Sequence, residues 1–326
     1  MERDRGGPRR PLAVIGWVAL VPALVLLGMR LAPSQSWTPA AQLVGLLPLT
    51  ALPAMAALLV LGMARRRVGT VVAAGAVVGL LTLLLPRAVD TRADSGAPGE
   101  HLRVGAVNAY FGRADASALA ATIEEQALDL VCVAEATPRL EADLRAAGLT
   151  AYLPSLVSAA EGGTSGTVLY SRLPVTALPE VPGTRFRMPR AAVAAPSGVT
   201  VTVTCAHPLP PRAGGLDGWH TELRRIRDTV ATTTGPQVVL GDFNATWDHR
   251  LLRDIVAAGD LRDVANTAGA GLRPTWPMRD GPIPMPFVAI DRILTDLDVV
   301  DYGLVDAEGS DHRMVVATLG VTPGPG

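Results

Sequence analysis

The stretch QVVLGDFNA, residues 237–245, decides how the second part of this 326-residue chain is expected to fold. Its apolar, β-branched start is typical of a buried strand, and Gly241 ends that pattern. Asp242 and Asn244 lie two residues apart, so in an extended segment both side chains face the same side. A turn explains the same residues, since Gly, Asp and Asn all favour turns. The stretch therefore predicts a strand that ends either in a polar pair or in a turn.

Polar side chains follow or interrupt apolar runs on either side of this stretch as well. They are Asn108 after RVGAV, Glu135 after DLVCVA, His207 after VTVTCA, Asp291 within FVAIDRIL, and Asp311 with His312 in GSDHRMVV. Open α/β sheets place their ligand groups where strands end. These residues are therefore candidates for one site.

Short β-rich runs alternate with helical patterns through this part of the chain. The runs are residues 103–107, 129–134, 167–170, 199–205, 237–240, 288–294 and 314–319, and the clearest helices are residues 115–127, 138–147, 220–232 and 249–258. Several runs are continuously apolar, which indicates sheets that are covered on both faces. A domain of about 220 residues suits this layered α/β pattern, and we place it at residues 101–320.

The N-terminal part has the composition of a membrane region. Residues 12–29, 40–64 and 68–86 contain no charge, and each stretch is long enough as a helix to cross a hydrocarbon layer of about 30 Å. A buried core helix explains any one of them, but not three in succession. A cleaved signal peptide is disfavoured because two further spans follow the first. We expect three transmembrane helices within residues 1–86.

The arginines predict how these spans are oriented. Four arginines precede the first span and three, at residues 65–67, separate the second from the third, whereas only Arg30 lies between the first and second. Positive loops stay in the cytoplasm, so we expect a multi-pass protein of the cell membrane with a cytoplasmic N-terminus and an extracytoplasmic second part. Residues 87–100 are polar and Gly/Pro-containing, as in a flexible linker, and residues 321–326 are expected to be a disordered tail.

Charge and cysteine content limit the function further. All basic residues are arginine, and from Arg87 onward 21 arginines stand against 28 acidic residues, a formal net charge of −7. This balance argues against strong non-specific binding of a nucleic acid backbone. Cys132 and Cys205 each lie in an apolar run, so they are either two small core residues or one disulfide, which is chemically allowed outside the cytoplasm.

Six motifs together resemble a known family. In chain order VNAYF, VAEAT, TCAHP, GDFNA, AIDRIL and SDHR resemble the successive motifs of the endonuclease/exonuclease/phosphatase superfamily, over residues 101–319. The resemblance implies a four-layer α/β sandwich, in which two packed mixed β-sheets are flanked by helices and the site lies at the rim where loops from both sheets converge. It also implies a Mg²⁺ or Mn²⁺ cofactor, with Glu135 as the main ligand, Asn108 beside it and Asp311 as a metal-side carboxylate.

The same resemblance implies roles for the other candidates. Asp242 would hold the attacking water or accept its proton, and Asn244 would donate to the phosphate or the attacking oxygen. His207 would donate to a phosphate oxygen, working best when protonated or held by a carboxylate, and His312 would stabilise charge there with Asp291 as its carboxylate partner. A phosphodiester is an anion attacked by hydroxide, so a hard cation, a proton acceptor and hydrogen-bond donors are the groups that its hydrolysis needs.

Two loops and three histidines have no role assigned by these motifs. Residues 182–190 hold three arginines around Phe186, and this loop and residues 208–218 are either solvated loops or elements of substrate selection. His101, His220 and His249 match no motif and are expected at the surface.

The leading hypothesis is therefore a metal-dependent hydrolase that cleaves a phosphodiester or phosphomonoester at the outer side of the membrane. Its substrate would be a phospholipid headgroup, a small phosphoester or nucleic acid, and no protein partner is predicted. The alternatives are a nuclease that acts on extracellular nucleic acid, a non-catalytic binding module on the same fold, and spans that act as a channel or sensor. The last is disfavoured because the spans contain no internal charge.

Overall fold

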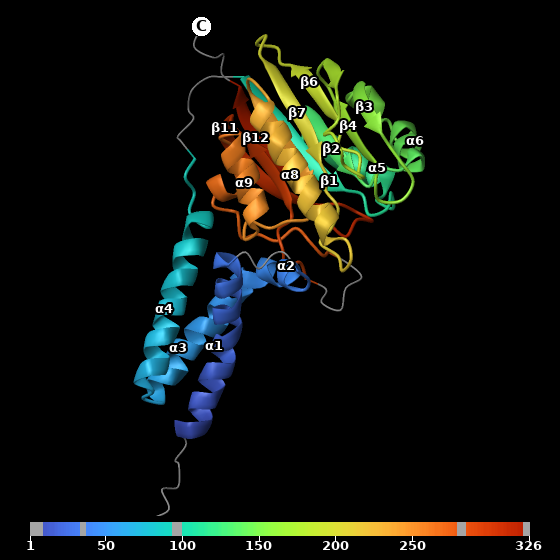
Figure 1. Cartoon of the computed structure of the whole chain (residues 1–326). Helices are drawn as coiled ribbons and strands as arrows, with labels where there is room; N and C mark the ends of the chain where they lie inside the picture. The colour runs from blue at the N-terminus through green and yellow to red at the C-terminus, as the bar shows by residue number, and fades with distance from the viewer. Residues whose placement is uncertain (1–8, 33–36, 93–99, 279–284, 322–326) are drawn as a thin grey trace, which may run out of the picture. The chain divides into compact units, whose positions relative to one another are not determined.

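The computed structural model describes residues 9–32, 37–92, 100–278 and 285–321. The chain divides into two compact units, Met1–Pro86 and Arg87–Gly326. Figure 1 draws both units.

The first unit contains the three predicted apolar helices. Arg9–Leu31, Ala40–Met63 and Arg67–Arg87 are long and apolar enough to cross a membrane. The second of them is not a uniform α-helix, because α2 (Ala40–Leu43) and α3 (Ala51–Met63) are joined by the 3₁₀ segment η2 (Val44–Thr50), which contains Pro48. Gly16 of α1 (Arg9–Leu31) faces Leu61 of α3 so closely that a Cβ atom would lie 2.6 Å from its Cγ, so any larger residue would force the Leu61 side chain to move.

The second unit is built around two mixed six-stranded sheets. In the first sheet the order is β11 (Asp298–Asp306), β12 (Arg313–Val321), β1 (Glu100–Asn108), β2 (Leu130–Ala134), β4 (Thr167–Ser171) and β3 (Ser155–Ala159). In the second it is β5 (Val175–Leu178), β6 (Arg190–Ala194), β7 (Thr200–Ala206), β8 (Gln237–Asp242), β10 (Asp291–Thr295) and β9 (Arg262–Asp263). Among the strand pairs of the described residues, only β1 with β2 and β7 with β8 are parallel.

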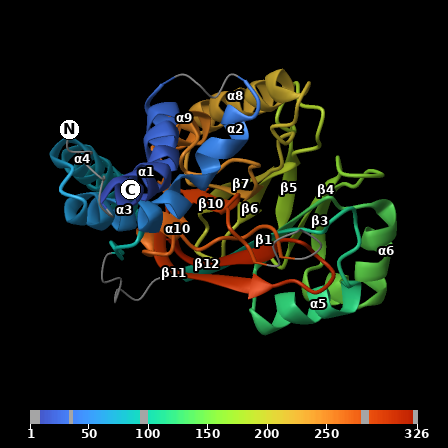
Figure 2. The same ribbon diagram turned by 90° about the horizontal axis from the view of Figure 1, so that it is seen from below.

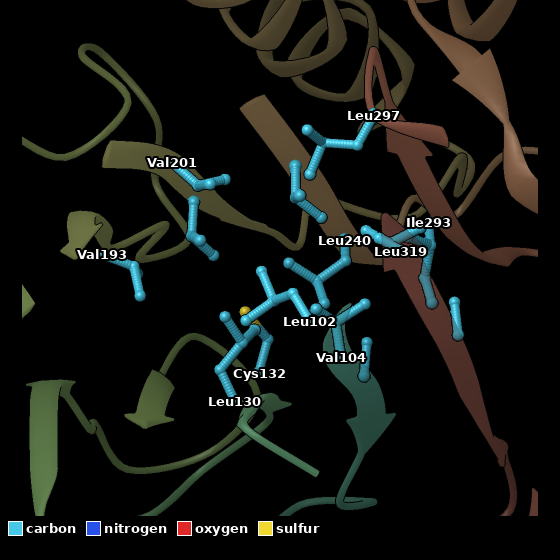
Figure 3. Packing of buried hydrophobic residues seen from close by; sticks show 14 of the residues in the cluster. Leu102, Val104, Leu130, Cys132, Val193, Val201, Leu240, Ile293, Leu297 and Leu319 are labelled. Carbon is cyan, nitrogen blue, oxygen red and sulfur yellow. The ribbon is translucent and has the colours of Figure 1, made fainter. Parts of the chain in front are cut away.

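Alternation along the central strands explains the four layers. Leu102, Val104 and Leu130 of the first sheet pack against Val201 and Leu240 of the second, which forms the core between the sheets (Figure 3). The strand residues between them face outward, where α5 (Ala116–Glu125) and α6 (Pro138–Ala146) cover the first sheet. The helices α8 (Leu216–Thr232) and α9 (Arg250–Ala258) cover the second sheet (Figures 1 and 2). The predicted fold is therefore confirmed.

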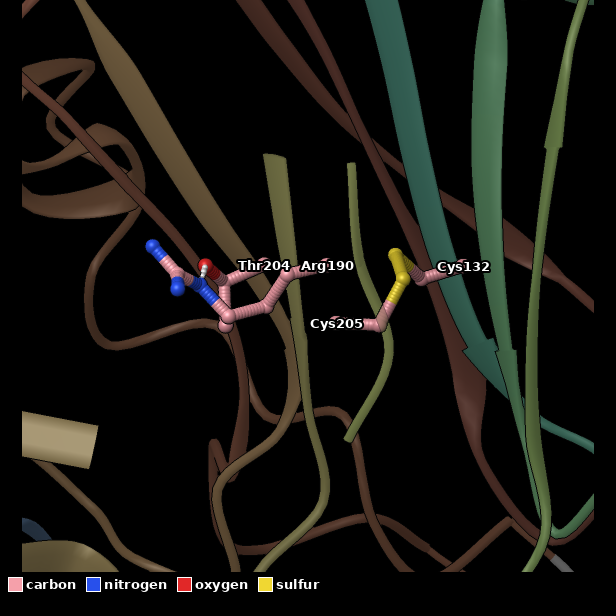
Figure 4. Close-up of a disulfide and its surroundings, with 4 residues drawn as sticks. All are labelled: Cys132, Arg190, Thr204 and Cys205. Atoms are coloured by element: carbon pink, nitrogen blue, oxygen red, sulfur yellow. Dashed lines mark hydrogen bonds between the residues drawn. A yellow bond between two sulfur atoms is a disulfide. The ribbon is translucent and has the colours of Figure 1, made fainter. Parts of the chain in front are cut away.

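One disulfide links the two sheets. Cys132 of β2 and Cys205 of β7 are bonded, with their Cα atoms 5.6 Å apart (Figure 4). The sequence left two possibilities open for these cysteines, and the structure selects the disulfide. A closed loop of 73 residues stabilises a fold by about 4 kcal/mol through the lost entropy of the unfolded chain.

The predicted flexible linker is wrong at both of its ends. Arg87 is 3% exposed and its Nη1 lies 3.0 Å from Oδ2 of Asp248, and the N–H group of Thr91 donates to the carbonyl of Thr267. Glu100 already belongs to β1. These residues fold as part of the second unit because they find hydrogen-bond and ion-pair partners there, and residues 93–99 lie outside the described part. In the predicted tail Val321 still belongs to β12, and residues 322–326 are outside the described part.

Candidate active site

The strand topology brings the candidate residues to one rim of the sandwich. Asn108 ends β1 and Glu135 follows β2, while His207 follows β7 and Asp242 ends β8. Asp291 begins β10, whose antiparallel register places it opposite Asp242. His312 directly precedes β12, which runs antiparallel to β1. The ends of four strands and the starts of two therefore meet at the same edge.

Asn108 joins the two sheets. Its Nδ2 donates to Oε1 of Glu135 at 3.2 Å and to Oδ2 of Asp242 at 3.1 Å, while its Oδ1 accepts from the N–H group of Tyr110 at 2.9 Å. The amide is 1% exposed. One buried side chain thus fixes a carboxylate of each sheet.

Glu135 lies in a segment whose backbone conformation is unfavourable for residues other than glycine. It has φ +53°, and Tyr110 and Phe111 opposite it have φ +49° and +56°, a region that residues other than glycine rarely adopt. Oε2 of Glu135 accepts from the N–H group of Phe111 at 2.5 Å. Burial raises the pKa of Glu135, although hydrogen bonds from Phe111 and Asn108 act in the other direction.

His312 and Asp291 form a buried ion pair. Nδ1 of His312 lies 2.9 Å from Oδ2 and 3.1 Å from Oδ1 of Asp291, and its Nε2 lies 3.8 Å from Oδ2 of Asp242. Burial alone would lower the pKa of His312, but the carboxylates of Asp291 and Asp242 outweigh it and raise that pKa to about 10. The imidazole is therefore held as a cation that faces Asp242.

His207 differs from this pair. It is 1% exposed, and its Nε2 lies 4.0 Å from Oδ2 of Asp242, beyond hydrogen-bond distance. Burial, together with the charge of His312, lowers the pKa of His207 to about 3. His207 was expected to work best when protonated or held by a carboxylate, whereas the lowered pKa favours the neutral ring, which donates through only one ring nitrogen.

Asp242 is the centre of the arrangement. It is 2% exposed, and its Oδ1 accepts from the N–H group of Asn244 at 2.8 Å. Burial raises the pKa of Asp242 to about 7, although the charge of His312 opposes the shift. Nδ2 of Asn244 donates to the carbonyl of Pro208 at 2.9 Å. Strand and turn thus coexist here, since β8 ends at Asp242 and Asn244 has φ +48°.

Asp311 lies at the edge of the same cluster. Its Oδ2 accepts from Nε1 of Trp276 at 3.0 Å, and its Oδ1 lies 3.8 Å from Nε2 of His312. The ring centroid of Trp276 is 6.2 Å from that of His312. All eight predicted site residues therefore lie around one small region.

A comparison with known families now identifies the unit. The profile of the Endonuclease/Exonuclease/phosphatase family matches residues 105–312, which include all eight residues. The chain belongs to this family. Members of the endonuclease/exonuclease/phosphatase family are phosphoesterases, so phosphoester hydrolysis is the general chemistry of this site.

Solved structures of the family share the fold. The endonuclease/exonuclease/phosphatase from Beutenbergia cavernae DSM 12333 has a TM-score of 0.52 and 20% identity, covering 69% of this chain and 72% of that one. TDP2 of D. rerio complexed with single strand DNA product has a TM-score of 0.54 and 15% identity, covering 68% of this chain and 100% of that one. A family protein from Bacteroides thetaiotaomicron has a TM-score of 0.52 and 14% identity, covering 70% and 100%. No curated protein matches the sequence.

The donor set of this family site fits a divalent cation. Glu135, Asp242 and Asp311 supply carboxylate oxygens, the ligands that such cations prefer, and burial raises the pKa values of Glu135 and Asp242. Ligand atoms of Asp242, Asp291 and His312 also lie within 4.8 Å of one another. Both oxygens of Asp291 face Nδ1 of His312, so within that trio Asp291 and His312 are already engaged with each other as an ion pair.

The structure adds supporting residues that the motifs did not single out. Ser310 Oγ donates to the carbonyl of Asn108 at 2.6 Å and accepts from the N–H group of His312 at 2.9 Å. Thr275 Oγ1 accepts from the N–H group of Asp291 at 3.2 Å. The signal for Ser310 was present in the sequence, next to Asp311. The surface expectation for His249 is wrong, because it is 3% exposed and its Nδ1 accepts from the N–H group of Thr246.

Proposed function

We propose that this chain is a Mg²⁺- or Mn²⁺-dependent hydrolase that cleaves a phosphoester at the outer side of the membrane. The observation that carries the proposal is the meeting of Glu135, Asn108 and Asp242 with the Asp291–His312 ion pair at one rim. The first group suits a cation and a water, whereas the second suits the negative charge of a phosphate.

Each residue of the site has its own role in the proposed hydrolysis. Glu135 and Asp311 would hold the cation with Asn108 beside it, and the cation would neutralise phosphate charge when bound. Asp242, fixed by Asn108 and Asn244, orients the attacking water and accepts its proton. Nε2 of the cationic His312 donates to a phosphate oxygen, and Asp291 holds that ring in place and stabilises its charge. His207 donates as a neutral ring, and Asn244 fixes the loop that carries His207 through the carbonyl of Pro208.

Membrane attachment and side are supported by independent features. Three helices are apolar enough to span a membrane, and the arginines favour a cytoplasmic N-terminus. The Cys132–Cys205 disulfide suits an oxidising compartment. The net charge of −7 disfavours a nuclease acting on long duplexes, so a phospholipid headgroup or small phosphoester is the favoured substrate.

Metal removal and one substitution test the proposal. EDTA should abolish turnover of bis-p-nitrophenyl phosphate or p-nitrophenyl phosphate by the full chain in detergent, and Mg²⁺ or Mn²⁺ should restore it. Asp242→Ala should lower kcat by about 10²–10⁴-fold without a change of fold, because the water loses its acceptor. Asp298→Ala, at an exposed carboxylate, serves as the control. Turnover that survives both EDTA and Asp242→Ala would refute the assigned roles of the metal and of Asp242, whereas a folded wild-type chain that hydrolyses neither substrate with Mg²⁺ or Mn²⁺ present would favour the binding-module alternative.

The proposed side of the membrane has its own test. Protease added to intact spheroplasts should digest the second unit, whereas protection until the membrane is lysed would reverse the orientation.

A further inference from the structure

Two loops border His207 at the rim of the site. The segment between β5 and β6 contains Phe186, whose ring centroid lies 4.9 Å from that of His207. The segment between β7 and α8 begins with His207 and Pro208, and the carbonyl of Pro208 accepts from Asn244 at 2.9 Å. The positions of both loops therefore decide where the side chain of His207 points and where the carbonyl that accepts from Asn244 lies.

One buried carboxylate holds both loops. Glu222 of α8 is 2% exposed, with Oε1 accepting from the N–H group of Arg185 at 2.6 Å and Oε2 accepting from that of Leu209 at 2.8 Å. The N–H group of Phe186 also acts to lower the pKa of this carboxylate. Burial raises the pKa of Glu222, and these backbone bonds offset part of the cost.

Glu222 lies on the buried face of its helix. It shares the buried face of α8 with Trp219, Leu223 and Ile226, at the spacing of an apolar stripe. Burying a carboxylate at such a position costs free energy unless its oxygens accept hydrogen bonds. Since its oxygens bind backbone N–H groups of residues 37 and 13 positions away, an apolar residue would pack in its place but would leave both loops without this anchor.

We propose that Glu222 is a positioning residue, which fixes the loops around His207 and so sets the placement of His207 and Phe186 for phosphoester cleavage. The effect on turnover rests on the proposed function. The hydrogen bonds from Glu222 to the two loops, which we call the clamp, do not depend on it.

A double-mutant cycle tests whether Glu222 acts through His207. Glu222→Gln replaces one acceptor oxygen by an NH₂ group that faces backbone donors, so it should lower kcat by about 10–100-fold through misplacement of the ring, with KM changed less than about threefold. In a His207→Ala background the same change should lower kcat by less than about threefold. Equal losses in both backgrounds, or no loss in the wild-type background, would overturn the proposal. Asp228→Asn, at an exposed carboxylate of the same helix, is the matched control.

Hydrogen exchange of the full chain in detergent supplies a readout without turnover. In Glu222→Gln, amides of residues 183–189 and 207–215 should both exchange at least about tenfold faster, while α9 keeps its protection. Unchanged exchange, a change in one loop alone, or faster exchange throughout would each refute the clamp. If the Gln variant does not fold, Glu222→Asp, which keeps the charge but shortens the reach, is judged by the same criteria. A wild-type chain that hydrolyses no phosphoester would defeat the proposed function, whereas the exchange data would still decide the clamp.

Discussion

At the residue scale, the ion pair of Asp291 and His312 makes a clear prediction. Asp291→Asn keeps the size of the side chain but removes the charge that holds Nδ1 of His312, whose cationic form is then stabilised less. We expect kcat to fall by about 10²–10⁴-fold, because the ring can be neutral or in the wrong tautomer. Asp298→Asn should leave kcat unchanged. Steady-state kinetics with melting curves checks this, and a fully active Asp291→Asn would argue against the assigned role of His312.

Phe111 allows the backbone and the ring to be tested apart. Its N–H group binds Glu135, whereas its ring is 44% exposed beside the site. Phe111→Ala keeps the N–H group, so we expect kcat within about twofold, and KM raised several-fold for phosphodiesters that carry an apolar group. A methyl phosphodiester serves as the control substrate. Equal KM values for the wild-type and Phe111→Ala enzymes on both substrates would show that the ring contacts no substrate.

The sequence predicted the eight candidate residues because each is marked by its place at a strand end within a motif. Their placement around one region is now a structural finding, while their individual roles remain predictions. Glu222 was not found, because its importance depends on N–H groups far away along the chain that no local pattern reveals. The neutral state of His207 was also missed, since it depends on the depth of burial and on the nearby charge of His312.

At the element scale, the strands that the sequence missed are mostly the edges of the sheets. β3, β5, β9 and β11 lie at the four edges, where one side of the strand is unpaired and the burial pattern is broken. The central strands were predicted because they are buried on both faces and read as apolar runs. β6 was missed as well, because RAAVA contains a single β-branched residue.

The segment after the third apolar helix makes a stability prediction. Arg87→Met leaves the carboxylate of Asp248, whose side chain is 0% exposed, buried without this arginine. Loss of one partner of such a buried pair costs about 3–5 kcal/mol, so denaturant unfolding of the second unit should shift clearly to lower concentrations. The matched change Arg92→Met removes exposed ion pairs with Asp90 and Asp301 and a hydrogen bond to the carbonyl of Val300, so it should shift the unfolding midpoint much less than Arg87→Met does.

The double variant Arg87→Met/Asp248→Leu should recover much of the lost stability, because the buried charge is then removed. A soluble fragment should accordingly begin before Arg87 and not at His101. Equal stability of fragments that begin at residues 85 and 101 would contradict this account of residues 87–92.

At the scale of the whole molecule, the disulfide connects the fold with the side of the membrane. Cys132 and Cys205 belong to different sheets, so their bond spans the core that both sheets share. We expect the Cys132→Ala/Cys205→Ala variant to lose about 4 kcal/mol of unfolding free energy, and reductant to lower the melting temperature of the wild type but not of that variant.

The redox state of the same two cysteines inside living cells also reports on which side of the membrane the second unit lies. If the second unit lies outside the cytoplasm, cells that are quenched in acid, denatured and then alkylated without reductant should show neither cysteine labelled, because the oxidising compartment keeps the bond closed. Labelling of both cysteines after this denaturation would place the second unit in a reducing compartment, against the orientation that the arginines favour. Because this measurement needs no substrate, it tests the proposed location separately from the proposed hydrolysis.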